Sequence, residues 1–351
     1  MITRGDLNSL PEDEGVRFLA REPFRAIAST DRHGVVRRKP PVELLQPFEP
    51  NPEAETIIRN DEIEASDLFI ADLPGGTLLG ERAFVTRRHE ILVTDSFQRR
   101  HTAAIFEDDG RRRFEGVPLD LTPDGFLLSD PSKQKIELPG RVVALTAMEA
   151  ANYGAFLLRL VPKLILLRQS NLLDLPMIAP ANGWQRKILN FFGVSDEQII
   201  PHDRNEIYTA ESLVVPALRS SELFIDDGCM NFFQSVAGDV VRKNLGRPAY
   251  KHIYISRLSQ GKARPDYRLF MNEQELTDRL AARGFYIFEP EAHSFEEQIF
   301  VFASADLVIG PGGAGMFNTV FCRPGTKIIS LEPMLNWLGL HLNLFSGGLH
   351  D

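Results

Sequence analysis

Between Tyr250 and Pro333, apolar and polar positions alternate between the period of a strand and that of a helix. Alternating β-branched and aromatic residues predict strands at 252–257, 285–290, 306–310 and from Thr326. Apolar positions at helical spacing predict helices at 272–284, 294–303 and 316–322. Short links between strands and helices predict a parallel sheet with right-handed crossovers, as in half of a nucleotide-binding α/β architecture.

A glycine-rich segment, Gly310-Pro311-Gly312-Gly313-Ala314-Gly315, lies between the third of these strands and the helix after it. This is the general ligand position in open α/β sheets. Glycines let the main chain approach a ligand closely, and free N–H groups at a helix start favour an anion. A tight turn that packs helix on strand explains the segment equally well, and its spacing matches neither common phosphate-binding motif. The segment therefore suggests a phosphate but does not establish one.

Upstream, the expected elements are shorter and less regular. Alternating runs separated by turns predict a β-rich stretch from Asp67 to Phe126, with a hairpin near Arg87–Glu90. In the apolar segment Phe156–Arg168, Pro162 predicts a short helix followed by a turn and a strand. Further strands and helices are expected at 139–145, 175–180, 183–192, 199–201, 213–216 and 231–243.

The chain length of 351 residues favours two domains. Residues 1–60 are interpreted as an extension and linker, with a short helix at 14–28 and an extended, Pro-rich stretch at 37–55. Residues 61–245 form the predicted amino-terminal domain, β-rich and α/β, and 246–351 the carboxyl-terminal α/β domain. Gly246-Arg247-Pro248 is the predicted boundary, because Gly and Pro favour a turn or loop between regular elements. Two such domains would place a ligand in the cleft between them.

The composition of the chain limits the classes of function that it can have. Hydrophobic residues make up 43% and charged residues 25% of the chain, as in an ordinary soluble globular protein. The net charge of −9 argues against nucleic-acid binding. Two cysteines, Cys229 and Cys322, build neither a disulfide framework nor a zinc site by themselves and suit a reducing cytosol. Without a long apolar run or a signal core, a cytoplasmic location is expected; peripheral attachment to the inner face of the membrane stays open.

The order of the motifs carries a family resemblance. In the carboxyl-terminal part of the chain the motifs are, in order, YISR (254–257), Asn272-Glu273, SFEEQ (294–298), GPGGAGMFN (310–318), Pro324-Gly325 and Glu332-Pro333. Upstream, NYGAFLLRLVPKL (152–164) is similar to N-Y-x-H-F/W-L-x-x-x-L-P-R-L. Together these motifs resemble glycosyltransferase family 61, from about Asp67 to the end of the chain.

The resemblance implies a GT-B architecture of two Rossmann-like domains, here with a β-rich amino-terminal segment. It implies inverting transfer of a hexosyl or pentosyl group from a nucleotide-sugar donor, such as a UDP-sugar, to a glycan or glycoconjugate acceptor in bacterial polysaccharide assembly. The carboxyl-terminal domain would hold the nucleotide diphosphate. Metal ions and further cofactors would not be required, because protein cations and helix dipoles stabilise the leaving diphosphate. GT-B chains usually finish with a helix crossing back, whereas this sequence runs on from its last strand into GLHLNLFSGGLHD.

Several residues fit the donor side of such a reaction. Arg257, at a strand's carboxyl end, would place two N–H donors on phosphate oxygens, and Arg264 or Arg268 would add a second cation. The amides of Gly312, Gly313, Ala314 and Gly315 would add neutral donors. Glu297, Asn318 and Glu332 complete the predicted donor site. Each also has a structural explanation: a surface ion pair for Arg257, a capping box for Glu297 with Ser294, and internal loop contacts for Asn318.

The chain departs from the family pattern at two histidine positions, which are Ala155 and Gly312 here, and Arg159 stands where a carboxylate is common. Inverting transfer still needs a base for the acceptor hydroxyl. His202 and Asp203 are the best candidates by position, with Glu206, Asp226 and Asp227 as alternatives, and all of them also suit polar loops. The competing hypothesis is an inactive member of the same fold that binds nucleotide sugar or glycan. A nicotinamide-dependent dehydrogenase is disfavoured, because no G-x-G-x-x-G unit with a downstream acid is present.

Overall fold

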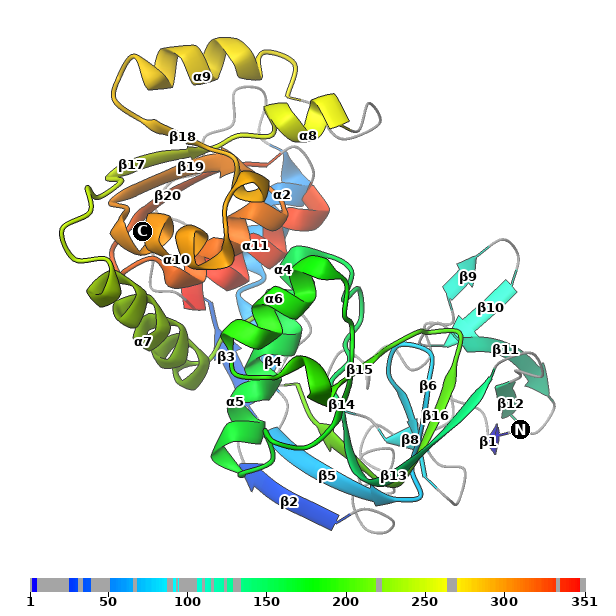
Figure 1. Ribbon diagram of the computed structural model, residues 1–351. Helices are drawn as coiled ribbons and strands as arrows, with labels where there is room; N and C mark the ends of the chain where they lie inside the picture. The colour runs from blue at the N-terminus through cyan, green and yellow to red at the C-terminus, as the bar shows by residue number, and fades with distance from the viewer. Residues whose placement is uncertain are drawn as a thin grey trace. The chain divides into compact units, whose positions relative to one another are not determined.

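The computed structural model describes residues 2–4, 25–30, 34–38, 51–65, 68–86, 91–92, 94, 106–108, 111–114, 117–122, 125–128, 134–218, 223–263, 270–332 and 335–347 (Figure 1). The chain divides into two compact units. The first unit comprises Met1–Val35 and Glu64–Ser221, and the second unit comprises Val36–Ile63 and Glu222–Asp351. Both contain parallel strands and helices, so the α/β class is as predicted.

A four-stranded parallel sheet forms the centre of the second unit. Its strands are β17 (His252–Ile255), β18 (Tyr286–Phe288), β19 (Leu307–Pro311) and β20 (Lys327–Leu331). All four predicted strands are confirmed, in the order β18-β17-β19-β20. The strand order therefore reverses between β17 and β19, and such a switch point is where open α/β sheets bind ligands.

The helices that connect these strands are α8 (Leu258–Ala263), α9 (Glu273–Ala281), η4 (Pro290–Ala292), α10 (Phe295–Ser304) and η5 (Ala314–Phe321). The predicted helix after the glycine-rich segment is thus a 3₁₀-helix. Helix α7 (Asp227–Lys243) packs on α10 and η5, with Phe233 edge-on against Phe321 at 5.5 Å between ring centroids. These contacts place α7 in the second unit, which starts upstream of Gly246.

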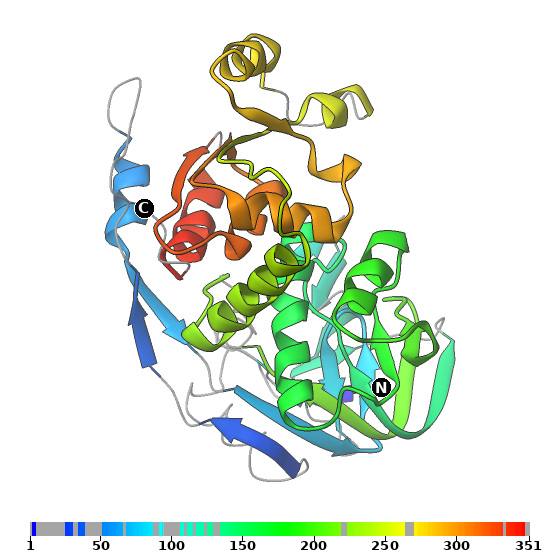
Figure 2. The same cartoon turned by 60° about the vertical axis from the view of Figure 1, so that its left-hand side comes forward.

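Two further helices of the second unit were not expected. Residues 52–55, assigned to an extended linker, begin helix α2 (Pro52–Arg59), and the segment after β20 forms α11 (Leu335–Gly347). The two helices lie side by side (Figures 1 and 2), with Ala54, Leu338 and Leu342 in a shared apolar core. The Arg38 side chain joins both helices, because it donates to the Ile57 carbonyl at 2.6 Å and to Asn343 Oδ1 at 3.1 Å.

The first unit is built on a larger mixed sheet. Its order is β15-β14-β13-β16-β6-β7-β8, with β5 beside β16 and β2 beside β5. The strands are β2 (Arg25–Thr30), β5 (Leu68–Pro74), β6 (Thr77–Leu79), β7 (Ala83–Val85), β8 (Ile91–Leu92), β13 (Lys135–Ala144), β14 (Met177–Ala179), β15 (Ile199–Pro201) and β16 (Ile207–Pro216). Strands β13 to β16 run parallel, whereas β5 and β6 run antiparallel to β16.

The amino-terminal β-rich prediction is confirmed by β5 to β8 and by a second, antiparallel sheet. That sheet contains β1 (Ile2–Arg4), β9 (Phe106–Asp108), β10 (Arg111–Phe114), β11 (Val117–Thr122) and β12 (Gly125–Leu128). The short strands β3 (Gly34–Arg37) and β4 (Glu62–Ala65) pair with each other. The helix expected at 14–28 is wrong for residues 25–28, which belong to β2, while 14–24 lie outside the described residues. The predicted hairpin is confirmed by the antiparallel pairing of β7 with β8, although its turn residues 87–90 lie outside the described residues.

The apolar segment after β13 is helical throughout. It consists of α4 (Tyr153–Ala155), the π-helical η2 (Phe156–Leu160) and α5 (Val161–Gln169), so the turn and strand expected beyond Pro162 are wrong. Pro162 is the second residue of α5 and directly follows the π-helical η2, so the change of helix type coincides with the proline and the chain stays helical across it. The remaining helices of this unit are α6 (Gly183–Phe191) and η3 (Asp196–Gln198).

Candidate functional site

The carboxyl ends of the four parallel strands meet at one edge of the second unit's sheet. Arg257 follows β17, the glycine-rich segment follows β19, and Glu332 follows β20. Residues that are far apart in the sequence are thus brought to one edge, with Arg257 and Gly312 on the two sides of the switch point.

Arg257 lies across the glycine-rich segment. Its Nη2 donates to the Gly312 carbonyl at 2.6 Å, and a Cβ built on Gly313 would overlap the same nitrogen. Gly313 has a φ of 155°, so the backbone also favours glycine here. The Arg257 N–H donates to Glu273 Oε1 at 2.6 Å, and only 8% of Arg257 is exposed. Arg257 is therefore held both at its main chain, by Glu273, and at its guanidinium, by the Gly312 carbonyl.

Glu273 is buried beneath this position. Its carboxylate also accepts from the Tyr254 hydroxyl at 3.3 Å. Burial, followed by the neighbouring Glu273 charge, raises the pKa of Tyr254 above its usual value, so the hydroxyl stays a donor even in alkaline solution. The Asn272-Glu273 motif in the sequence thus supplies the carboxylate that fixes the end of β17, a role that the sequence did not reveal.

Glu332 lies on the other side of the segment. Its Oε1 accepts from His341 Nδ1 at 2.6 Å and from the Ser330 hydroxyl. Its Oε2 is buried and has no hydrogen-bond partner among the described residues. A Cβ built on Gly312 would overlap this oxygen. Gly312 and Gly313 are therefore covered by a carboxylate and a guanidinium respectively, and each glycine leaves room for one of them.

The first turn of η5 provides main-chain donors. Its first hydrogen bond runs from the Met316 N–H to the Gly313 carbonyl at 2.9 Å. The N–H groups of Ala314 and Gly315 precede this bond, so the helix itself does not satisfy them, and both residues are half-buried. Asn318 lies deeper and is fully buried, with its Nδ2 donating to Gln298 Oε1 at 3.0 Å. Asn318 thus joins η5 to α10.

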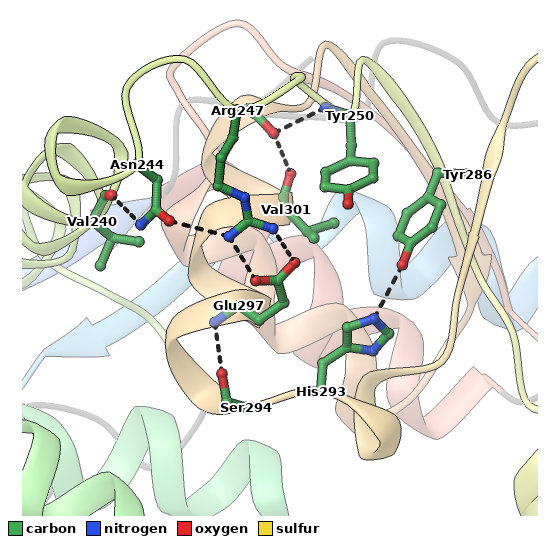
Figure 3. Close-up of polar contacts among 10 residues, drawn as sticks. Val240, Asn244, Arg247, Tyr250, Tyr286, His293, Ser294, Glu297 and Val301 are labelled. Carbon is green, nitrogen blue, oxygen red and sulfur yellow. Dashed lines mark hydrogen bonds and ion pairs between the residues drawn. The ribbon is translucent and has the colours of Figure 1, made fainter.

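Glu297 forms an ion pair (Figure 3). Its two oxygens accept from Arg247 Nη1 and Nη2 at 2.9 and 2.7 Å, and the Arg247 guanidinium also lies 4.5 Å from the centroid of the Phe300 ring. The hydrogen bond from Arg247 lowers the pKa of Glu297. The Glu297 N–H donates to Ser294 Oγ at 3.2 Å, so the capping function of Ser294 is confirmed. In this structure the Glu297 carboxylate binds the segment between α7 and β17.

Arg264, and Arg268 with it, lies outside the described residues. The predicted second cation therefore stays a prediction. Along the described parts of the chain, no group of three or more His, Cys, Asp or Glu side chains is arranged to hold a metal ion.

In the first unit, His202 follows β15 and is held in one orientation. Its Nε2 lies 2.8 Å from the Gly80 carbonyl, which can only accept, so Nε2 carries the hydrogen and Nδ1 keeps its lone pair. Burial lowers the pKa of His202. Asp203 lies in the exposed turn that follows, and its Oδ1 accepts from the Asn205 N–H at 2.8 Å. No hydrogen bond joins His202 to Asp203 within this described turn, so they do not act as a bonded pair here.

The alternative acids have structural partners. Glu206 accepts from the buried Tyr208 hydroxyl at 2.8 Å, and Asp226 caps α7 by accepting from the Cys229 N–H at 2.8 Å. Asp227 is the first residue of that helix. Position and tautomer therefore favour His202 among these candidates.

The segment after β13 is fixed by two buried cations, Arg159 and Lys163, of which the sequence pointed only to Arg159. Lys163 donates to the Thr146 carbonyl at 2.8 Å, and Arg159 donates to the Met148 carbonyl at 3.1 Å. Asn152 of the NYGAF segment caps α4, because its side chain accepts from the Gly154 and Ala155 N–H groups. Ala155 is buried in this first turn. The residues that resemble the family motif in this segment thus fix the backbone after β13.

Comparison with known proteins places the chain in a family. The family model for Glycosyltransferase 61 matches residues 153–329, just over half of the chain. The protein belongs to glycosyltransferase family 61. A search of curated proteins gave no match.

Membership of family 61 means that this glycosyltransferase acts on a sugar donor and an acceptor. The matched range contains His202, Arg257 and Gly312–Gly315, whereas Glu332 and His341 lie beyond it. His341 was missed from the sequence, since nothing local to it indicates a partner just after β20. Within the described chain, no helix of this glycosyltransferase has the length and apolarity needed to cross a membrane.

Proposed function

We propose that the protein is an inverting glycosyltransferase of GT-B type, with two Rossmann-like domains, that uses a nucleotide-sugar donor such as a UDP-sugar. The acceptor would be a glycan or glycoconjugate in bacterial polysaccharide assembly, on the cytoplasmic side and with peripheral contact to the membrane. The observation that supports this most is the Arg257 guanidinium, which lies on a glycine-rich segment at the switch point of a parallel sheet.

In the proposed reaction the acceptor hydroxyl loses its proton to His202 Nδ1 and its oxygen attacks the anomeric carbon. The bond from that carbon to the diphosphate breaks with inversion, and the diphosphate leaves with the electron pair. A phosphate oxygen is a stronger partner for Arg257 than the neutral Gly312 carbonyl, because both partners are then charged. The N–H groups of Ala314 and Gly315 would add preorganised donors where charge develops.

The other predicted residues are assigned smaller roles. Glu332 would accept from ribose hydroxyls through Oε2. Arg264 would supply a second cation, and Asn318 and Glu297 would hold η5 and α10 in position. Asp203 would shape the turn after His202. The resemblance calls for no metal or further cofactor in this chemistry.

Thermal-shift measurements with UDP, GDP, UDP-sugars and GDP-sugars test the proposal. A binder of the folded state raises Tm, by an amount that grows as the logarithm of concentration over Kd. We expect a shift with at least one nucleotide diphosphate and sugar transfer to a glycan acceptor with the matching donor. Binding without transfer or donor hydrolysis would favour the second candidate, an inactive nucleotide-sugar or glycan-binding member of the family, which the absence of histidine at Ala155 and Gly312 supports.

A further inference from the structure

The pair formed by Glu332 and His341 is placed beside the glycine-rich segment by two different elements. Glu332 follows the end of β20, and His341 lies in α11, nine residues further along the chain. The carboxylate accepts from Nδ1 at 2.6 Å, which fixes the hydrogen on Nδ1. His341 is 1% exposed and lies among the rings of Phe317, Trp337 and Phe345. The imidazole can therefore hold only one orientation.

Both members of the pair retain an atom without a partner. Glu332 Oε2 and His341 Nε2 are buried and have no hydrogen-bond partner among the described residues. Buried polar atoms are rarely left unpaired in folded proteins, and a site for a ligand is one explanation of such an exception. The Oε2 atom lies against Gly312, where any side chain would collide with it. The imidazole thus holds a carboxylate whose second oxygen faces the main chain of the candidate site.

Charge in this area is arranged in a way that matches one class of ligand. A carboxylate covers Gly312 and a guanidinium covers the next residue, Gly313. A carboxylate accepts from hydroxyl groups, and a guanidinium donates to phosphate oxygens. A nucleoside diphosphate carries both a ribose hydroxyl pair and phosphate charge, so both residues could engage a single molecule of that class.

We propose that His341 is a positioning residue, which holds Glu332 so that Oε2 accepts from a ribose hydroxyl of the nucleotide donor. This inference rests on the proposed function and deepens it, since it assigns ribose selection to residues that lie beyond the range matched by the family model. The alternative is that the pair only fastens α11 to β20. The two explanations differ in what a lost hydrogen bond does to selectivity, so they can be separated by experiment.

Two variants at one position separate hydrogen bonding from packing. His341→Phe keeps an aromatic ring in the apolar environment but loses the Nδ1 donor. His341→Asn loses ring volume, yet its amide N–H₂ can occupy the place of Nδ1. We expect His341→Phe to be the more stable variant and His341→Asn to be the better at selecting ribose. A merely structural role predicts that nucleotide affinity follows thermal stability in both.

The test measures the Kd of UDP and of 2′-deoxy-UDP, with GDP and 2′-deoxy-GDP in parallel, for the full chain and each variant. The wild type should prefer the ribonucleotide by about tenfold or more, as expected for loss of one hydrogen bond to a charged group. His341→Phe should lose most of this preference and His341→Asn should retain part of it. Glu332→Gln, which preserves shape, should also lose it, so the test does not depend on His341→Phe folding.

Each outcome bears on a separate claim. Equal affinity of the wild type for ribo- and deoxynucleotides, or full preference in folded His341→Phe, would overturn the role of His341 and leave the proposed transferase intact. If the wild type bound no nucleotide diphosphate, both the role of His341 and the proposed transferase function would be overturned.

Discussion

The carboxyl ends of the parallel strands carry different kinds of polar contact in the two units. In the first unit, His202 bonds to the Gly80 carbonyl and Lys163 to the Thr146 carbonyl, so these side chains hold loops in place. In the second unit, Arg257 and Glu332 lie on two glycines, and Glu332 Oε2 has no partner among the described residues. The first unit's polar groups are thus used up in its own loops, whereas the second unit keeps a carboxylate oxygen unpaired, and our proposal assigns the leaving group to the second unit and the base, His202, to the first.

The largest expected effect is on the rate. His202→Gln retains an amide donor for the Gly80 carbonyl but removes the lone pair of Nδ1. Loss of a general base costs about 10²–10⁴-fold in kcat, with little change in nucleotide Kd. Steady-state kinetics would show this, with exposed His252→Gln as the matched control. An unchanged kcat would remove His202 from the reaction and weaken the division of roles between the units.

The pH dependence of the rate is a second test of His202. A base works only when deprotonated, and burial lowers the pKa of His202 below its usual value of about 6.5. The acid limb of kcat/KM should therefore lie below pH 6.5, and activity should be retained as pH rises above it. An acid limb of kcat/KM above pH 7 that is still present in His202 variants would point to another base.

Arg257→Ala should weaken binding of a nucleotide diphosphate about 10–100-fold, because it removes charge-assisted hydrogen bonds. Calorimetric titration measures this directly. Arg279→Ala is a suitable control, since Arg279 pairs with Glu275 on the exposed surface of α9. Arg257→Lys should recover only part of the affinity, because an ammonium cannot form the two-pronged contact. Equal affinity in Arg257→Ala would show that the charges of the second unit serve the fold alone.

The two glycines allow a finer comparison within the second unit. Gly313→Ala would displace the Arg257 guanidinium and also strain the backbone at its φ of 155°, whereas Gly312→Ala would displace only the Glu332 carboxylate. We expect roughly tenfold weaker nucleotide binding for Gly313→Ala and a loss of ribose preference for Gly312→Ala. Gly183→Ala, where an added Cβ meets nothing within 4 Å, is the control. Identical effects of both substitutions would mean that the two glycines do not serve separate partners.

The smallest effect is expected at the ion pair of Arg247 and Glu297. Both side chains are partly exposed, so Arg247→Ala should lower Tm by only about a few degrees and leave nucleotide affinity unchanged. Because Arg247 lowers the pKa of Glu297, the pair's contribution is present at neutral pH and is lost as the pH falls and the carboxylate is protonated. A changed nucleotide Kd in Arg247→Ala would return Glu297 to the donor site.

Much of the second unit could be predicted because its information is local. Strands β17 to β20 show alternating patterns, and the glycine-rich segment lies where a parallel sheet places ligands. Helices α2 and α11 were missed because their apolar faces have meaning only against each other, across almost 300 residues of sequence. Helix α11 also brings His341 to Glu332, so that pair could not be predicted from the sequence either.

In the first unit the errors have a different origin. Pro162 was taken to end a helix, yet the chain stays helical across it, directly after the π-helical η2, and the sequence alone does not show that change of helix type. A further error lies in the second unit, where Gly312 looked like the loss of a functional histidine. In the structure, the space beside Gly312 is filled by the Glu332 carboxylate, which explains why a side chain is absent at that position.

The central claim is that Arg257 and the glycine-rich segment bind a nucleotide diphosphate. A crystal structure with bound UDP tests it most directly. The account predicts that the Arg257 guanidinium exchanges the Gly312 carbonyl for a phosphate oxygen at about 2.7–2.9 Å, with the Ala314 or Gly315 N–H donating to the same group. A nucleotide bound away from β17 and β19, with Arg257 still on the Gly312 carbonyl, would contradict it.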